Sequence, residues 1–358
     1  MRLSAVAVAS AVAWTVPSAT VIPTRSWIGA GPILAGSHVV WASTSPSVAF
    51  YVSGPARRVW RATRVPVPAD ARDDPSYDVR VAQRVSSVSS SALRTVFVRS
   101  IDLQLIPRCA SEDPPCLAPI RLKAWRGEVW TGPPTGPFRL LAGGKGKPIA
   151  LDADVDGRAI LYSDTVPAQS SRVVLVRRGA PPIVLASSRD VDFPSIALAG
   201  RYAAWIERRT IEHWPAPPRT LVVYDIAARR VAYTLGVEEL GHALLIAFDL
   251  QRNGTVALAS DPSPGPGCDG GVAWASIAEP HPHYLTGNAI PWRIKIAAGR
   301  IAFITRSCGA PTPFRLVLET REGRILSDSV IVYGGFDFDG RRLAYLTEPK
   351  EIAVVPAR

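Results

Sequence analysis

The chain has 358 residues, 47% of them hydrophobic, and a formal net charge of +11 from 41 basic and 30 acidic residues. Its 33 prolines and the lack of an apolar stripe at helical spacing beyond the N-terminus exclude a helical fold. The charge would attract an anionic partner, although the scattered arginines of a GC-rich genome would also produce it. Because no run of five basic residues occurs and no aromatics interleave with a basic cluster, the charge does not indicate nucleic-acid binding.

The first residues have the pattern of a secretory signal peptide. Residues 1–16 have a positive start and then an apolar stretch, and Pro17-Ser18-Ala19 is a small-residue cleavage site. The apolar stretch is too short for a membrane span, and Pro17 interrupts it. We therefore expect residues 1–19 to be removed on export and residues 20–358 to form a single domain without a transmembrane segment. An uncleaved anchor or a misassigned start codon is the alternative.

A turn followed by a strand recurs along the whole chain. The clearest copy is Phe336 to Glu348, in which Asp339-Gly340 is a hairpin signal and an apolar and aromatic run follows. Six copies place an apolar or aromatic anchor four or five residues after the turn glycine, and a seventh copy, Ala92 to Phe97, has lost the glycine. Successive anchors are roughly 40 to 65 residues apart, which fits one four-stranded sheet per copy. The anchors are Trp41, Phe97, Tyr162, Trp205, Leu258, Phe303 and Tyr345.

Each copy predicts four antiparallel strands joined in sequence. The fourth copy shows them as Ile196–Ala199, Tyr202–Ile206, Leu221–Ile226 and Val231–Leu235, rich in the β-branched and aromatic residues that favour strands. Such a meander cannot bury both of its faces alone, but radial stacking of the units buries them. We predict an all-β fold, a β-propeller of seven blades with four antiparallel strands each. Six blades is the alternative.

The two ends of the chain predict how the ring closes. After Gly340 the sequence holds only the anchor strand and one more, Ile352–Val355, so the last blade lacks its outer strand. Residues Thr20–Ser26 precede the first strand of the first copy and are free to supply it. We therefore expect the mature N-terminus to close the last blade. Residues Arg64–Val79, rich in Pro and Asp, are interpreted as a polar insertion between the first two copies.

The repeats resemble those of a known family. The stretches Asp156–Tyr162, Gly200–Trp205 and Asp339–Tyr345 follow a pattern that is similar to the repeats of the TolB-like, WD-like β-propellers of bacterial envelopes. The resemblance extends from about Trp27 to the C-terminus. It implies a propeller fold, and it does not single out an activity, because these propellers include peptidase gate domains, partners in transport complexes and proteins of unknown role.

Four cysteines support export, because an even number lies in loop-like segments rich in Pro, Gly and Asp. Cys109 and Cys116 bracket a short loop. Cys268 and Cys308 follow the anchor strands of neighbouring copies, so their loops are expected to emerge side by side. We predict the disulfides Cys109 to Cys116 and Cys268 to Cys308. Zinc binding is the alternative, although no Cys-x-x-Cys pair supports it.

Two sets of polar residues are candidates for a site. Asp152, Asp154 and Asp156 with Gly157 resemble the start of a calcium loop, but the closing ligands are missing, so a hairpin turn with solvated carboxylates is preferred and no metal is expected. Connections between blades line the rim of a propeller channel. They provide a candidate binding rim, for which a solvated loop is the alternative, made of Arg189, Asp190, Asp192, Glu238, Glu239 and His242.

The function expected from these patterns is binding rather than catalysis. We predict a monomeric bacterial protein, secreted or in the cell envelope, that acts as a non-enzymatic scaffold and binds a protein or an anionic envelope polymer through its loop face. No cofactor is expected. The alternative is a glycan lyase or hydrolase that uses the acidic rim of the channel. A propeller that binds a small ligand such as a quinone is the third possibility.

Overall fold

The computed structural model describes most of the chain after residue 19. Strands make up nearly all of its regular structure, and the only helix among the described residues is a short 3-10 turn, η1 (Ala69–Ala71). The predicted all-β class is therefore confirmed. The predicted signal peptide and all four cysteines lie outside the described residues, which are 20–24, 27–45, 48–54, 57–71, 76–108, 120–166, 169–209, 219–236, 239, 244–261, 271–286, 293–305, 314–331, 335–348 and 350–357.

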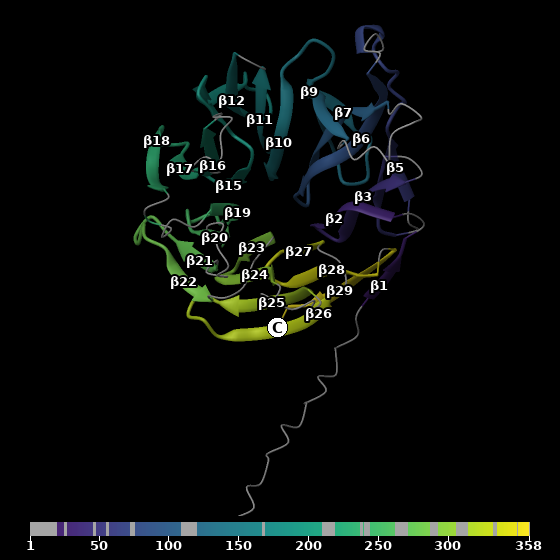
Figure 1. The fold of residues 1–358 in the computed structure, drawn as a ribbon. Helices are drawn as coiled ribbons and strands as arrows, with labels where there is room; N and C mark the ends of the chain where they lie inside the picture. Colours follow the sequence, from purple (N-terminus) through teal and green to yellow (C-terminus); the bar gives the residue numbers. More distant parts are fainter. Residues whose placement is uncertain are drawn as a thin grey trace, which may run out of the picture.

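The described strands form seven antiparallel sheets around a common axis (Figure 1). We number the sheets in chain order, and the first strand of each lies nearest the axis. Sheet 1 has β2 (Trp27–Ala35), β3 (His38–Ser45), β4 (Ala49–Val52) and β5 (Arg57–Arg61). Sheet 2 has β6 (Tyr77–Ser90), β7 (Thr95–Pro107), β8 (Arg121–Gly132) and β9 (Arg139–Gly143). Sheet 3 has β10 (Ile149–Asp156), β11 (Ala159–Val166), β12 (Ser170–Val176) and β13 (Ile183–Ser188).

Sheet 4 differs from the others because two short strands, β14 and β15, share the position nearest the axis and both pair with β16. It has β14 (Val191–Asp192), β15 (Ile196–Ala199), β16 (Tyr202–Arg209), β17 (Arg219–Asp225) and β18 (Arg230–Leu235). Sheet 5 has β19 (Leu244–Leu250), β20 (Val256–Asp261), β21 (Val272–Ala275) and β22 (His283–Thr286). Sheet 6 has β23 (Arg293–Ala297), β24 (Arg300–Thr305), β25 (Phe314–Thr320) and β26 (Ile325–Ile331). Sheet 7 has β27 (Phe336–Phe338), β28 (Arg342–Glu348), β29 (Glu351–Pro356) and β1 (Thr20–Pro23).

The turn that repeats in the sequence joins the first and second strands of a sheet. Its six glycines all have a positive φ, between 59° and 87°, which a residue with a Cβ adopts only with strain. At Gly340 an added Cβ would also approach the side chains of Ala297 and Ala298 in sheet 6 to 3.2 Å. The anchor residues that follow these turns lie on the second strand of each sheet, which is the position that the repeat predicted.

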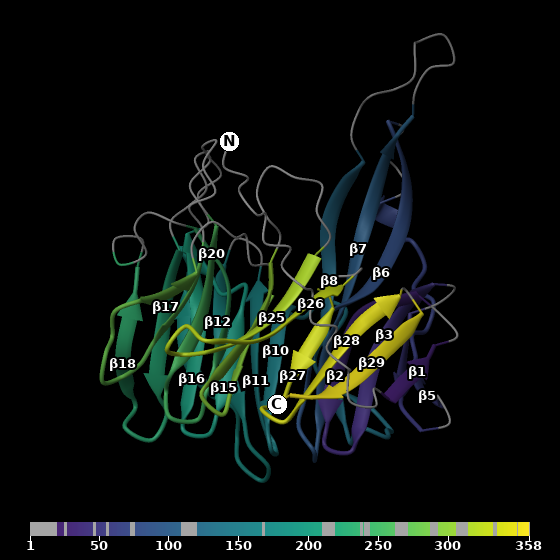
Figure 2. The same ribbon diagram turned by 90° about the horizontal axis from the view of Figure 1, so that it is seen from below.

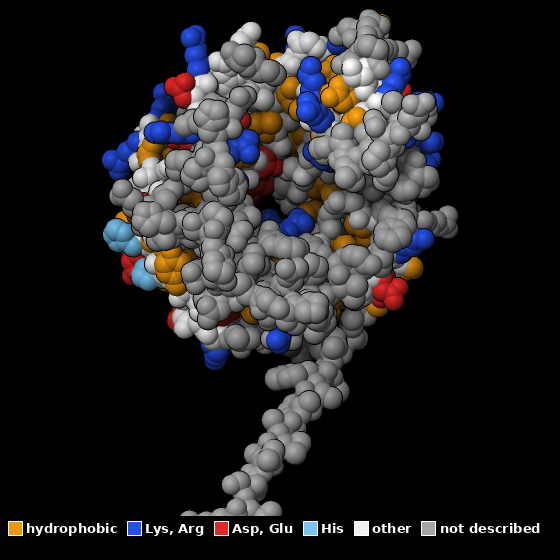
Figure 3. Space-filling view, viewed as in Figure 1, with side chains coloured by type: hydrophobic (Ala, Val, Ile, Leu, Met, Phe, Trp, Pro, Cys, Tyr) orange, Lys and Arg blue, Asp and Glu red, His pale blue; other side chains and the backbone are white. Residues whose placement is uncertain are grey.

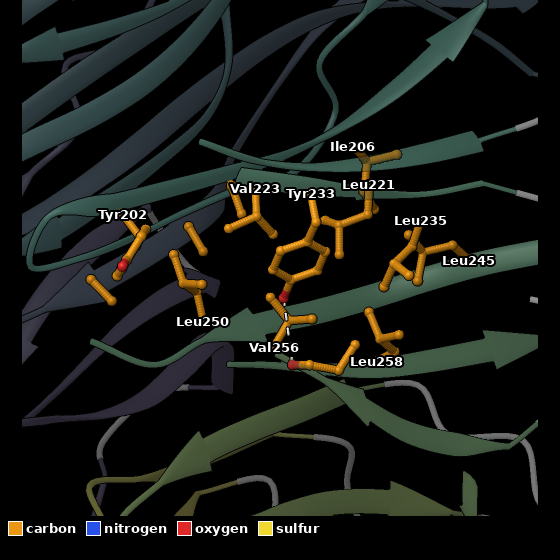
Figure 4. Packing of buried hydrophobic residues seen from close by; sticks show 14 of the residues in the cluster. Tyr202, Ile206, Leu221, Val223, Tyr233, Leu235, Leu245, Leu250, Val256 and Leu258 are labelled. Atoms are coloured by element: carbon orange, nitrogen blue, oxygen red, sulfur yellow. Dashed lines mark hydrogen bonds between the residues drawn. The ribbon is translucent and has the colours of Figure 1, made fainter. Parts of the chain in front are cut away.

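The hydrophobic core lies between sheets, and the buried residues described here form one cluster at each junction of neighbouring sheets. Figure 4 shows the cluster between sheets 4 and 5, where Ile206 and Leu221 of one sheet face Leu245 and Leu258 of the next. The Tyr233 hydroxyl crosses this junction and donates a hydrogen bond of 2.9 Å to the carbonyl oxygen of Gly254. Each sheet thus depends on both of its neighbours for burial.

Sheet 7 is built from both ends of the chain. β1 pairs antiparallel with β29, with Val21 opposite Ala353 and Ile22 opposite Ile352. Sheets 7 and 1 are joined by a cluster that contains Trp41 and Ile352, and Ile22 packs against it. The N-terminal segment therefore stabilises the junction between the first and last sheets.

Three strands of sheet 2 are much longer than the rest. β6, β7 and β8 have 14, 13 and 12 residues, and their upper halves stand out from one face of the ring (Figure 2). We call the part formed by residues 77–84, 100–108 and 120–126 the ribbon. The sequence assigned residues 77–79 to a polar insertion, but they begin β6, because their alternating pattern continues into the strand.

Ile22→Asp should destabilise the fold much more than Val21→Asp. Ile22 packs against the junction between sheets 7 and 1, whereas half of the Val21 side chain is exposed. A buried carboxylate next to Ile352 lacks a partner, so we expect Ile22→Asp to lower the free energy of unfolding by about 3 kcal/mol and Val21→Asp by less than about 1 kcal/mol. Urea unfolding followed by tryptophan fluorescence measures both. Equal effects of the two variants would contradict closure by β1.

Candidate functional site

The strands nearest the axis line a central channel with charged side chains. Figure 3 shows a hollow at the centre of the ring, with acidic and basic side chains inside it. Within it lies a cavity of about 380 Å³, lined by parts of β2, β6, β10 and β23 and by Pro194 and Ser195. Its polar side chains are Ser86, Ser87, Asp152, Ser195 and Arg293.

The three aspartates of the calcium-like motif lie on β10 and face the next sheet. Their carboxylates accept hydrogen bonds from backbone amides at every second residue of the neighbouring segment, so they are spread along the strand and do not converge on one point. Among the described residues no cluster of three His, Cys, Asp or Glu side chains could hold a metal ion. The turn interpretation expected solvated carboxylates, but all three are partly buried and hydrogen-bonded to the next sheet. The bonds join Asp152 to Ile196 at 2.9 Å, Asp154 to Leu198 at 2.6 Å and Asp156 to Gly200 at 2.6 Å.

The same contact recurs at two other junctions. Asp249 of β19 accepts a hydrogen bond of 2.8 Å from the amide of Ile296 in β23. Asp337 of β27 accepts one of 2.8 Å from the amide of Leu34 in β2. In each case a carboxylate on the innermost strand satisfies a backbone amide on the innermost strand of the next sheet. These aspartates therefore join the sheets around the channel.

Burial changes the protonation of this set. Burial raises the pKa of Asp152 to about 6, and the nearby charge of Asp154 adds to the rise. Hydrogen bonds from the amides of Ile196 and Ala153 favour the ionised form and partly oppose this rise. Burial also raises the pKa of Asp154 and of Asp249. Asp152, Asp154 and Asp249 are thus harder to ionise than exposed aspartates.

Two basic residues of β23 face these carboxylates. Lys295 forms an ion pair of 3.4 Å with Asp249, and its side chain is 29% exposed. Burial alone would lower the pKa of Lys295, but the fields of Asp249, Asp337 and Asp154 together raise it. Two residues earlier, Arg293 lies on the same side of the strand and lines the cavity. The pKa of Arg293 is lowered by burial, with Asp337 and Asp249 acting in the opposite direction.

The sequence did not single out Arg293 and Lys295. The signal was present, because both residues alternate with isoleucines in the strand just before a turn glycine, where other copies have aspartates. A charge at an alternate position of an innermost strand points toward the channel or the next sheet. Recognising it requires the strand to be placed at the axis, which the repeat pattern alone does not do.

The candidate rim is only partly described, because Glu238 and His242 lie outside the described residues. Asp192 lies between sheets 3 and 4, where its carboxylate accepts a hydrogen bond of 2.7 Å from the Ser171 hydroxyl and pairs with Arg208 at 3.4 Å. Arg189 is exposed and lines a separate open cavity of about 700 Å³, and Asp190 next to it is also exposed. Glu239 accepts a hydrogen bond of 2.8 Å from the amide of Gly236 in its own loop.

Three rim residues, Arg189, Asp190 and Asp192, are therefore neighbours at the junction of sheets 3 and 4. Asp192 contacts β12 and β16, and neither it nor Arg189 lines the cavity in the channel. Ligand binding by this group stays a prediction.

The ribbon has an open edge. β8 pairs with β7 from Arg121 to Gly132, but it pairs with β9 only from Glu128 to Thr131. On the side away from β7, residues Arg121–Arg126 therefore have no strand partner among the described residues. Ile120 and Leu122 are more than half exposed on this segment.

A buried network fixes the base of the ribbon. Arg99 of β7, whose side chain is 3% exposed, forms an ion pair of 3.1 Å with Glu128 of β8. It also donates hydrogen bonds to the Gln83 side chain, at 2.5 Å, and to the Thr63 carbonyl oxygen, at 2.7 Å. Trp130 completes the network by donating to Glu128 at 3.0 Å. The three long strands are thus held rigidly where they leave the ring.

Comparison with known proteins adds to this geometry. No protein-family model matches the chain, and no curated protein matches it in sequence. The WD40 β-propeller domain of Doa1 matches with a TM-score of 0.51 and 9% identity over 95% of each chain. The fold is a β-propeller. We therefore call the seven sheets blades.

Two further solved structures match the chain at similarly low sequence identity. An acylaminoacyl peptidase from Pyrococcus horikoshii matches with a TM-score of 0.53 and 12% identity over 88% of this chain and 48% of the peptidase. TolB from Acinetobacter baumannii matches with a TM-score of 0.42 and 11% identity over 78% of this chain and 80% of that one. Likeness at this level of identity shows the propeller fold alone. No helix in the described part of the chain is long and apolar enough to cross a membrane.

The Asp152→Asn variant should gain stability relative to the native chain as the pH rises. Because the pKa of Asp152 is about 6 in the folded state and about 4 in an unfolded chain, the folded chain keeps a proton that the unfolded chain releases between these values. The native free energy of unfolding therefore falls across this window, and asparagine does not titrate. We expect the difference in free energy of unfolding between Asp152→Asn and the native chain to change by about 3 kcal/mol in favour of the variant from pH 4 to pH 7. Urea unfolding at four pH values measures it, and a constant difference would contradict it.

Arg99→Met should be far more harmful than Arg108→Met. The first change leaves Glu128 buried without its ion-pair partner, which costs about 3 to 5 kcal/mol. The second removes an exposed pair with Asp78, in which both side chains are more than half exposed, and costs less than about 1 kcal/mol. The free energies of unfolding in urea measure both effects. If the two variants were equally stable, the network would not hold the base of the ribbon.

Proposed function

We propose that this propeller is a non-enzymatic scaffold outside the cytoplasm, and that it binds an acidic, extended segment of a partner protein on its loop face. The observation that carries the proposal is the open edge of β8 on the ribbon, residues Arg121–Arg126. An unpaired edge offers a row of free N–H and C=O groups to which another chain can add a strand. The ribbon places this edge clear of the ring (Figure 2).

The charge of the ribbon favours an acidic partner. Among its described residues six are basic and two are acidic, and the two acids are already paired, Asp102 with Arg84 and Asp78 with Arg108. Arg121 and Lys123 alternate along the open edge and lie on the same face of it. An added strand with Asp or Glu opposite them would gain cross-strand ion pairs. The basic residues are Arg80, Arg84, Arg108, Arg121, Lys123 and Arg126.

Apolar side chains at the same edge add a second element of recognition. Leu122 is 56% exposed and Ile120 is 57% exposed, although both are large and hydrophobic. Because they alternate with Arg121 and Lys123, they lie on the opposite face of the strand. A partner strand with acidic residues on one face and apolar residues on the other would match both faces of the edge.

The proposed location follows from the sequence. A signal-like segment ends at Ala19, and β1 begins at Thr20, directly after the expected cleavage site. β1 pairs with β29, so a mature chain that began at Thr20 would keep the strand that completes sheet 7. The even number of cysteines is also typical of an exported chain.

Site-specific photo-cross-linking tests the proposal. A benzoylphenylalanine is placed at Leu122 on the open edge or, as a matched control, at Ile183, an exposed apolar residue of the outermost strand β13. In cells of the source organism we expect a discrete cross-linked protein from position 122 only. Adding Arg121→Glu and Lys123→Glu should abolish it. Adding Arg57→Glu and Arg58→Glu, on the exposed end of β5, should not.

The possible outcomes separate the parts of the proposal. Equal cross-linking from both positions, or survival of the product after the two substitutions in β8, would contradict binding at the open edge. Cross-links to an envelope polymer alone would replace the protein partner by that polymer. Recovery of the chain from the cytoplasm with residues 1–19 attached would contradict export. A product that disappears as the salt concentration rises would confirm the role of the basic residues.

A further inference from the structure

The cavity in the channel is lined by Arg293, a cation that has no ion-pair or hydrogen-bond partner among the described residues. Lys295 and Arg293 are two residues apart on β23, but only Lys295 is held by an ion pair, with Asp249. Among the residues that the structure describes, none forms a hydrogen bond or ion pair with the Arg293 guanidinium. A guanidinium with five donors in an enclosed polar space binds an oxyanion well, because such bonds are charge-assisted and often bidentate.

The remaining walls of the cavity are polar or open to the backbone. Ser86 and Ser87 of β6 and Ser195 of the segment before β15 contribute hydroxyls, and residues 29–31 of β2 line one side. The Ser86 hydroxyl also accepts a hydrogen bond from Ser100, and the Ser87 hydroxyl donates one to the carbonyl oxygen of Ala153. A volume of about 380 Å³ is within the range of small-molecule sites. These groups suit a molecule that carries several hydroxyls.

We propose that the channel binds a small hydroxylated monocarboxylate, with the carboxylate on Arg293 and the hydroxyls on the serines and the backbone of residues 29–31. This site is distinct from the ribbon and does not depend on the function proposed for it. It shares no residue with the open edge of β8.

The charge of the channel decides between a carboxylate and a phosphate. Four aspartates surround two cations, and Asp249, Asp337 and Asp154 already act on Lys295. Because the aspartates outnumber the cations, the net field in the channel is negative, and a dianion such as phosphate is repelled more strongly than a monoanion. The fourth aspartate is Asp152, whose carboxylate is held by two backbone amides and lines the same cavity.

Titration calorimetry with simple probes tests the site. The full chain is titrated with acetate, lactate and gluconate, with sorbitol as a neutral polyol, and with inorganic phosphate. We expect gluconate to bind more tightly than lactate and acetate, phosphate to bind at least tenfold more weakly than gluconate, and sorbitol not to bind. Arg293→Gln should weaken gluconate binding at least tenfold. Arg230→Gln, at an exposed arginine of the outer strand β18, should leave it unchanged.

Controls keep the outcome decisive. The melting temperature of Arg293→Gln shows whether the variant is folded. If it is not, Arg293→Lys replaces it, which keeps the charge but loses the bidentate geometry and should still weaken gluconate binding severalfold. No binding of any of the three carboxylates to the native chain would overturn the proposal. So would equal binding of gluconate to a folded Arg293 variant and to the native chain, or tighter binding of phosphate than of gluconate.

Discussion

Every innermost strand of this propeller is an edge strand, and the rest of the structure depends on how those edges are satisfied. Such a strand pairs with the second strand of its blade on one side. On the other side it faces the channel, where no further strand is available to accept hydrogen bonds from its backbone amides. Between blades 3 and 4, between 5 and 6 and between 7 and 1, aspartate side chains supply the acceptor. The cost of burying these carboxylates is seen in the raised pKa of Asp152.

This arrangement gives the channel its chemistry. Carboxylates that serve the backbone also surround the two cations of β23, and among the described residues only Lys295 forms an ion pair with one of them. The cation available to a ligand in the channel is thus Arg293, because Lys295 is already paired with an aspartate that joins two blades. Structural and binding roles are divided between two residues of one strand that are only two positions apart.

The ribbon differs from the innermost strands because its edge has no side chain or strand that satisfies it among the described residues. Where β6, β7 and β8 rise beyond the ring, residues Arg121–Arg126 of β8 have no strand partner on their outer side in the described part of the chain. Charged residues such as Arg121 and Lys123 are typical of edges that are protected from unselective pairing. Arg99 and Glu128 hold the base of the same strands inside the protein, so the projecting part is rigid at its root.

Much of the fold was predictable because it repeats. The turn glycines require positive φ, and the anchors after them are apolar, so both features are local and visible in the sequence, as at Gly340 and Tyr345. The pairing of the N-terminal strand with Ile352 followed from counting strands. The roles of Asp152 and Arg293 were not predictable, because they depend on which strand lies at the axis and which amide lies opposite in the next blade. The length of β8 relative to β9 is likewise a property of the assembled sheet.

The closure of the ring has a consequence for how the chain acquires its structure. The amide of Leu34 and the carboxylate of Asp337 that accepts its hydrogen bond are 303 positions apart in sequence, and β1 waits for a strand that ends two residues before the C-terminus. The flank of the first blade that holds Trp41 stays uncovered until β28 and β29 have been made. Contacts of such long range form slowly, and the exposed flank can associate with other chains in the meantime. Synthesis of this protein therefore includes an interval in which the ring is incomplete and prone to aggregation.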